Sequence, residues 1–108
     1  MKKIMQKIRF CFKRCLDKNE IDINELKELV KKGAILIDVR SPQEYKEEHL
    51  DNAILIPEYD INKKILDRFS VNENIILYCS TGNRSRRVKK KLEKMGYTNV
   101  YNLRDGIN

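Results

Sequence analysis

The chain has 108 residues, 41% of them hydrophobic, which is enough for a single domain with one modest core. Its formal net charge of +7 comes almost entirely from residues 1–19, which carry seven Lys or Arg against one Asp. The remainder carries sixteen Lys or Arg against fifteen Asp or Glu, so the overall charge gives no ground for a nucleic-acid-binding domain.

Residues 1–16 predict a basic amphipathic helix, and we divide the chain into this N-terminal segment, residues 1–19, and a domain of residues 20–108. Apolar side chains recur in the helix every three or four residues: Met1, Ile4, Met5, Ile8, Phe12, Cys15 and Leu16. Such a helix can pack on its own domain or on a partner protein, or lie as a peripheral contact on an anionic membrane. Cys11 and Cys15 have no His or further Cys nearby, so we interpret them as apolar filler and predict no metal site.

The same segment bears on the compartment of the protein. Charges interrupt its apolar residues, so it is not a secretory signal, and no stretch of the sequence is apolar enough to span a bilayer. The chain has three cysteines, an odd number, and free thiols are typical of a reducing cytosol. We therefore predict a cytoplasmic protein, with peripheral membrane contact as an alternative for the N-terminal helix.

Strands and helices alternate through the first half of the domain. Residues 20–23 predict a short strand, and Asp22 has capping-box spacing to Glu25 at the start of a helix that ends at Gly33. The apolar run of residues 34–39 then predicts a buried strand.

Two charged residues, Asp38 and Arg40, flank the carboxyl end of that strand. A surface ion pair or a turn is the ordinary interpretation of such neighbours. The carboxyl ends of parallel strands share one edge of the sheet, which is where α/β proteins bind ligands. Both residues are therefore also candidates for the surroundings of a functional site.

The next segment carries a clear helix start. Ser41 is an N-cap, Pro42 takes the first helical position and Glu44 the third, and we expect the helix to end near Glu48. His49 is the only histidine and has neither a nucleophile nor a metal cluster beside it in the sequence. We interpret it as making a structural hydrogen bond rather than acting as a general base.

The second half of the domain continues the alternation. Residues 53–56 predict a third short strand, and Asp60 caps a helix through Phe69. The apolar residues Ile75–Tyr78 predict a strand buried on both faces, residues 85–95 return to helical spacing, and residues 100–103 predict the last strand. The expected fold is α/β, with a mostly parallel five-stranded sheet flanked by helices.

A short polar loop joins the central strand to the helix after it. Its residues are Cys79, Ser80, Thr81, Gly82, Asn83, Arg84 and Ser85. So tight a turn can point backbone N–H groups inward at the cysteine sulfur, and a glycine permits the backbone angles that it needs. The helix N-terminus adds N–H groups and its positive dipole end, and Arg84 adds a permanent charge. We predict an anion-binding loop that lowers the pKa of Cys79 and holds a thiolate, a persulfide or an oxyanion.

An inert interpretation of Cys79 has to be weighed against this one. A cysteine after an apolar strand is more often a small buried hydrophobe than a nucleophile. A packing cysteine, however, needs neither a glycine nor an arginine nor a helix-capping serine, and all three follow Cys79. We therefore interpret it as the nucleophile.

The pattern Cys79-x-x-Gly82-x-Arg84-Ser85 resembles the active-site loop of the single-domain rhodaneses, which are sulfurtransferases. The resemblance extends from Ile21 to Ile107 through Leu36-Ile37-Asp38-Val39-Arg40, Glu44-Tyr45, His49-Leu50-Asp51-Asn52-Ala53 and Val100-Tyr101-Asn102-Leu103. It implies a single rhodanese-like domain in which Asp38 and Arg40 support and charge the mouth of the site.

The resemblance also implies an activity. Sulfane sulfur would pass from a small anionic donor such as thiosulfate to a small-molecule or protein thiol, or to cyanide, through a persulfide on Cys79. Backbone N–H groups of residues 80–85 would hold the charged sulfur, Ser80 and Thr81 would offer hydroxyl donors, and Arg84 would attract the donor. No metal, organic cofactor or nucleic acid takes part.

The C-terminal end departs from the family pattern. Family members usually carry a second glycine beside Gly106 and then a tryptophan in a final helix. In this sequence Asp105 replaces that glycine, there is no tryptophan, and the last residue is Asn108. We expect one face of the sheet to be under-covered, and the helix of residues 1–16 to occupy that space.

Two other functions stay open. The domain can be a binding or sulfur-relay module that its N-terminal helix recruits to a partner or membrane, although an intact anion-binding loop argues against an inert one. Cysteine phosphatases of related fold use a similar loop that is longer by one residue. The segment from Cys79 to Arg84 is the shorter form, suited to a single sulfur atom.

Overall fold

The computed structural model describes residues 19–108, apart from the side chains of residues 63, 64 and 66. The predicted helix of residues 1–16, its two cysteines and its packing on the domain lie outside the described residues. The rest forms a five-stranded sheet of order β1-β5-β4-β2-β3 in which every neighbouring pair is parallel. The predicted α/β class and five-stranded sheet are confirmed.

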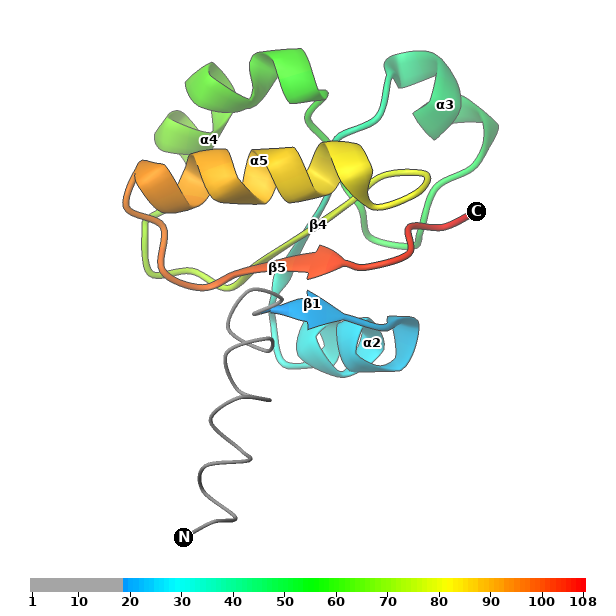
Figure 1. Ribbon diagram of the computed structural model, residues 1–108, viewed down its shortest axis with the longest axis horizontal. Coiled ribbons are helices and arrows are strands. Elements are labelled where there is room, and N and C mark those ends of the chain that lie inside the picture. Colours follow the sequence, from blue (N-terminus) through cyan, green and yellow to red (C-terminus); the bar gives the residue numbers. More distant parts are fainter. Residues whose placement is uncertain (1–18) are drawn as a thin grey trace, which may run out of the picture.

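The elements follow one another in strict alternation. The strands are β1 (Glu20–Ile21), β2 (Ile35–Asp38), β3 (Ile54–Leu55), β4 (Ile75–Tyr78) and β5 (Val100–Leu103). The helices are α2 (Ile23–Lys31), α3 (Pro42–Glu47), α4 (Ile61–Arg68) and α5 (Asn83–Lys94), and a 3-10 turn at Glu58–Asp60 precedes α4. Helices α4 and α5 cover one face of the sheet and α2 the other, while α3 stands near the loop between β4 and α5 (Figure 1).

The central strand β4 divides the core into two clusters. Ile75 and Leu77, with Cys79 after the strand, pack in the cluster that includes side chains of α4 and α5. Ile76 and Tyr78 pack in the cluster that includes α2. All five are buried, because successive side chains of a strand point to opposite faces and both faces of this sheet are covered.

The helix starts follow the predicted capping residues in two cases. The capping boxes of Asp22 with Glu25 and of Ser41 with Glu44 are both complete. Asp60 stands at the N-cap position of α4 but makes no side-chain capping hydrogen bond there, since the 3-10 turn continues directly into the helix.

Several element ends differ from the prediction by one or two residues. Helix α5 begins at Asn83 rather than Ser85, because Gly82 takes the N-cap position in the left-handed conformation, with φ of 94°. Ser85 therefore lies inside the first turn and is not the cap. Strands β2 and β3 are shorter than the predicted ranges 34–39 and 53–56, since only their central residues pair with a neighbouring strand.

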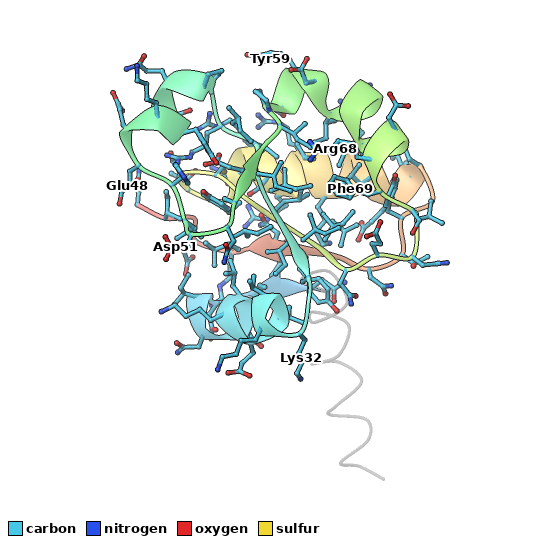
Figure 2. The ribbon with its side chains drawn as sticks, turned by 180° about the vertical axis from the view of Figure 1, so that it is seen from behind. Lys32, Glu48, Asp51, Tyr59, Arg68 and Phe69 are labelled. Carbon is cyan, nitrogen blue, oxygen red and sulfur yellow. The ribbon has the colours of Figure 1, made fainter. Side chains whose placement is uncertain are left out.

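A cavity of about 480 Å³ opens on the α2 side of the molecule. It lies between α2, whose C-cap residue Lys32 is labelled in Figure 2, and the loop that carries Asp51. Its walls are mainly apolar: Ile23, Leu26, Val30, Leu36 and Leu50. None of residues 79–85 lines it, so the cavity is separate from the predicted anion-binding loop. Across residues 19–108, no helix has the length and apolar character needed to cross a membrane.

Candidate active site

Cys79 lies directly after β4, at the carboxyl edge of the sheet, and has no exposed surface. The C-terminal residues pair with this strand end: Ile107 N–H donates to the Cys79 carbonyl at 3.2 Å, and Asn108 N–H to the Ser80 carbonyl at 3.0 Å. Gly106 permits this approach, because a Cβ there would lie 2.2 Å from the Ser80 carbonyl oxygen. Another molecule can reach the buried sulfur only when the atoms that surround the sulfur move.

Three donors converge on the sulfur of Cys79. The Gly82 N–H lies 3.1 Å from Sγ, the Ser85 N–H 3.4 Å and the Ser85 hydroxyl 3.4 Å. Burial by itself raises the pKa of the Cys79 thiol, but hydrogen bonds from the Ser85 hydroxyl and from the backbone of Ser85, Gly82 and Thr81 outweigh it and leave the pKa below its ordinary value. The environment therefore favours the thiolate.

The Gly82 peptide is held in place from several directions. Its carbonyl accepts hydrogen bonds from the Asn102 amide at 3.3 Å and from the Arg86 N–H at 3.1 Å, and it lies 3.3 Å from the Ser85 hydroxyl oxygen. A Cβ on Gly82 would lie 2.1 Å from the Arg104 carbonyl oxygen, so no other residue fits without a shift of the backbone. The tight turn thereby keeps the Gly82 N–H aimed at the sulfur.

Residues far away in the sequence support this loop. The carboxylate of Glu20 accepts hydrogen bonds from the Asn102 amide at 2.8 Å and from Arg86 at 3.1 Å, and Asn102 in turn reaches Gly82. The sequence prediction missed Glu20 and Asn102 because no local pattern connects them. Only the pairing of β1 with β5 brings the two residues side by side.

The guanidinium of Arg84 is paired with a carboxylate. It donates to both oxygens of Glu44 at 2.9 and 3.0 Å, and the Ser80 hydroxyl donates to the same carboxylate at 3.3 Å. Arg84 is the main cause that lowers the pKa of Glu44 to about 2. The sequence predicted Glu44 only as a capping residue, so its place beside the loop is a finding of the structure.

The remaining loop residues lie at the surface. Thr81 and Asn83 are exposed, and the Asn83 side chain accepts a hydrogen bond from Arg86 at 3.1 Å. Thr81 acts on the sulfur through its backbone N–H. Of the predicted hydroxyl donors, Ser80 reaches Glu44, and it is the Ser85 hydroxyl that reaches the sulfur.

Asp38 and Arg40 pair with each other at the neighbouring strand end. Arg40 donates from its side chain to both Asp38 oxygens at 2.9 to 3.2 Å and from its backbone N–H at 2.8 Å, and both residues are buried. The same guanidinium donates to the Glu48 carbonyl and lies 5.7 Å from the centre of the Tyr78 ring. The pair thus connects the end of α3 to the strands β2 and β4.

The histidine makes the kind of contact that the sequence predicted. His49 Nδ1 lies 2.7 Å from the Tyr45 carbonyl oxygen, and its ring stacks on the Tyr45 ring at 3.7 Å. Within residues 19–108, no three His, Cys, Asp or Glu side chains are grouped so that they could hold a metal ion.

Comparison with known proteins identifies the family. A family model described as a rhodanese-like domain matches residues 22–108. This chain is a member of the rhodanese family. The curated relatives of this rhodanese include the thiosulfate sulfurtransferase PspE of Escherichia coli, 39% identical over 67 residues that cover 61% of this chain and 64% of PspE. A protein named sulfurtransferase from Allochromatium vinosum is 30% identical over 91 residues, which cover 82% of this chain and 84% of the relative.

A solved structure extends the likeness to the fold. The crystal structure of SSP1007 from Staphylococcus saprophyticus superposes with a TM-score of 0.73 at 32% identity, covering 83% of this rhodanese and 90% of that chain. The chain spans between 19% and 64% of the length of the first curated relatives it matches. The names of the relatives support a rhodanese-type sulfurtransferase.

Proposed function

We propose that this rhodanese moves sulfane sulfur from a small anionic donor such as thiosulfate to a thiol or cyanide acceptor, through a persulfide on Cys79. The observation that carries the proposal is the convergence of the Gly82 N–H and the Ser85 N–H and hydroxyl on the Cys79 sulfur. A cysteine that only fills the core needs no such donors, whereas a thiolate does.

The reaction divides into a loading step and a transfer step. In loading, the Cys79 thiolate attacks the outer sulfur of thiosulfate, a new S–S bond forms, the S–S bond of thiosulfate breaks, and sulfite leaves with the electron pair. In transfer, an acceptor thiolate or cyanide attacks the outer persulfide sulfur and the Cys79 thiolate leaves. Loading moves the negative charge from Sγ to the outer sulfur of the persulfide, and transfer returns it to Sγ, so donors fixed around the end of the Cys79 side chain stabilise the charge in both states.

The other site residues have supporting roles in this proposal. The backbone of residues 80–85 forms the anion-binding loop, and Arg84 holds the loop to α3 through Glu44. Asp38 and Arg40 fix the neighbouring strand end, which completes the mouth of the site. A nucleophilic thiolate that must stay reduced suits the cytoplasm.

The full burial of Cys79 is the observation that favours the alternative, a binding or sulfur-relay module that a partner or membrane recruits through residues 1–16. Mass spectrometry of the full chain after thiosulfate treatment distinguishes the two. We expect the protein to gain one sulfur atom at Cys79 and to lose it when a thiol is added. The Cys79→Ser variant should gain none and should have no thiosulfate:cyanide activity, and a variant that kept full activity would exclude this cysteine as the carrier.

A further inference from the structure

Every arginine that the structure describes around the carboxyl edge of the sheet faces a carboxylate. The pairs are Arg40–Asp38, Arg84–Glu44, Arg86–Glu20, Arg87–Glu58 and Arg104–Asp105. Positive and negative side chains are therefore balanced locally at this edge. The hydrogen bonds to the Cys79 sulfur come from N–H and O–H groups, and each of these guanidiniums already faces a carboxylate when a second anionic group approaches.

Glu44 is the carboxylate of these pairs that contacts the residue directly after Cys79. Its carboxylate accepts from both arms of Arg84, from the hydroxyl of Ser80, which follows Cys79 directly, and from the Ser41 N–H at 2.9 Å. These contacts come from two parts of the chain, the loop after β4 and the N-cap of α3, and hold the carboxylate firmly. Because its pKa is about 2, Glu44 is ionised throughout the physiological range.

The position of this charge has a consequence for the donor. A dianion such as thiosulfate brings a sulfonate group as well as the sulfur to be transferred, and that group needs a cation to offset its loss of hydration. Arg84 would be that cation, but Glu44 repels the donor and so offsets the attraction by Arg84. This repulsion grows with the charge of the donor. A thiol-bound persulfide, R–S–SH, carries no sulfonate group, so the site has to accommodate only its outer sulfur.

We infer that Glu44 is a specificity-determining residue that turns the site away from dianionic donors and toward thiol-bound persulfides. The inference rests on the proposed sulfur transfer through Cys79 and replaces thiosulfate, as the preferred donor, by a thiol-bound persulfide. In the favoured loading step, the Cys79 thiolate attacks the outer sulfur of R–S–SH, the S–S bond of the donor breaks, and RS⁻ leaves. The proton on the outer sulfur stays there, so Cys79 becomes a protonated persulfide and the total charge is conserved.

The test replaces Glu44 by Gln in the full chain. Glutamine keeps an acceptor oxygen for the Ser41 N–H at the third helical position and removes the charge, together with the second acceptor oxygen that faces Arg84 and Ser80. The matched control is Glu47→Gln on the same helix, whose carboxylate accepts from Gln43 at 3.0 Å on the exposed side. Sulfur loading of Cys79 is measured as kcat/KM with thiosulfate and with cysteine persulfide, at low and at high ionic strength.

We expect E44Q to raise kcat/KM for thiosulfate about five- to tenfold at low ionic strength, because a unit charge close to a dianion is removed. The value for cysteine persulfide should not rise with it, and E47Q should change neither value. The gain with thiosulfate should shrink at high salt, since screening weakens the interaction that was removed.

Three outcomes would overturn the inference. If E44Q lowered the values for both donors equally while circular dichroism showed an intact fold, Glu44 would only hold the loop in place. If E44Q and wild type were indistinguishable with thiosulfate, Glu44 would not select the donor, although sulfur transfer itself would stand. If the wild-type protein gained no sulfur from either donor, the proposed function would fall and this inference with it.

Discussion

Asp38 and Cys79 stand at the ends of the neighbouring strands β2 and β4, and neither has any exposed surface. The two regions accommodate a buried acidic group in different ways. The carboxylate of Asp38 faces a full positive charge, the guanidinium of Arg40, at 2.9 Å. The hydrogen bonds to the sulfur of Cys79 come from neutral donors, at 3.1 and 3.4 Å.

The ion pair of Asp38 and the neutral hydrogen-bond donors around Cys79 suit different roles. A full counter-charge fixes a side chain in one state, because removal of either partner leaves an unpaired buried charge. Neutral dipoles stabilise an anion without forming an ion pair with it, so in the proposed sulfur transfer the same donors would hold a thiolate before loading and a persulfide after it. The ion pair therefore holds the end of β2 in one conformation. The neutral donors at the end of β4 leave the Cys79 sulfur able to change its chemical state.

The largest effect is expected at the end of β2. Asp38→Asn keeps the shape of the side chain but leaves the buried Arg40 without its counter-charge, which should lower the free energy of unfolding by about 3–5 kcal/mol. Urea denaturation measures this loss. The double variant Asp38→Leu with Arg40→Met removes both charges and should be less destabilised than the single one. A loss below about 1 kcal/mol for Asp38→Asn would contradict a stabilising role of the pair.

At the end of β4, the second prediction tests the backbone conformation of Gly82. Gly82→Ala should lower the free energy of unfolding by about 1–3 kcal/mol through its left-handed conformation, with a further loss from the close approach of the Arg104 carbonyl. It should also slow sulfur loading, because the N–H would no longer aim at the sulfur. Gly33→Ala is the control, since Gly33 has φ of 101° and open space around its Cβ position. Equal losses in both variants would show that the Arg104 contact does not matter.

A third substitution, with a smaller expected effect, tests the role of the neutral hydrogen-bond donors around Cys79. Ser85→Ala removes one hydrogen bond to Cys79 Sγ and should raise the pKa of the thiol, since that hydrogen bond stabilises the thiolate. The rate of alkylation by iodoacetamide, followed against pH, reports the pKa. The variant should reach its maximal rate at a higher pH than the wild-type protein. Ser80→Ala, whose hydroxyl faces Glu44, should leave this pKa unchanged.

The smallest effect concerns the partly exposed pair at the mouth. Both Glu44 and Arg84 have side chains that are 32% exposed, so Glu44→Gln should lower the free energy of unfolding by less than about 1 kcal/mol at neutral pH. Glu44 has a pKa of about 2 in the folded protein against an ordinary value of 4.5. Its contribution is therefore complete above about pH 4.5 and is lost as the pH falls toward 2. Urea midpoints of wild type and variant should converge over that interval, and a constant difference would contradict the link.

Much of this fold could be predicted because its signals are local. The capping boxes at Asp22 and Ser41 each lie within four residues, and the buried strand Ile75–Tyr78 is a continuous apolar run. Cys79 and the hydrogen-bond donors that reach its sulfur, Gly82 and Ser85, lie within seven consecutive residues. The start of α5 was placed two residues late, because the sequence did not show that Gly82 itself would be the N-cap.

The sequence by itself therefore determined the α/β alternation and the loop around Cys79, since hydrogen bonds between near neighbours form wherever the backbone folds locally. Only the tertiary structure decided what surrounds that loop. Glu44 reaches Arg84 across 40 residues, and Glu20 reaches Asn102 across 82. Such contacts depend on which strands lie side by side and on where α3 stands, and these are properties of the packed sheet that no short stretch of sequence contains.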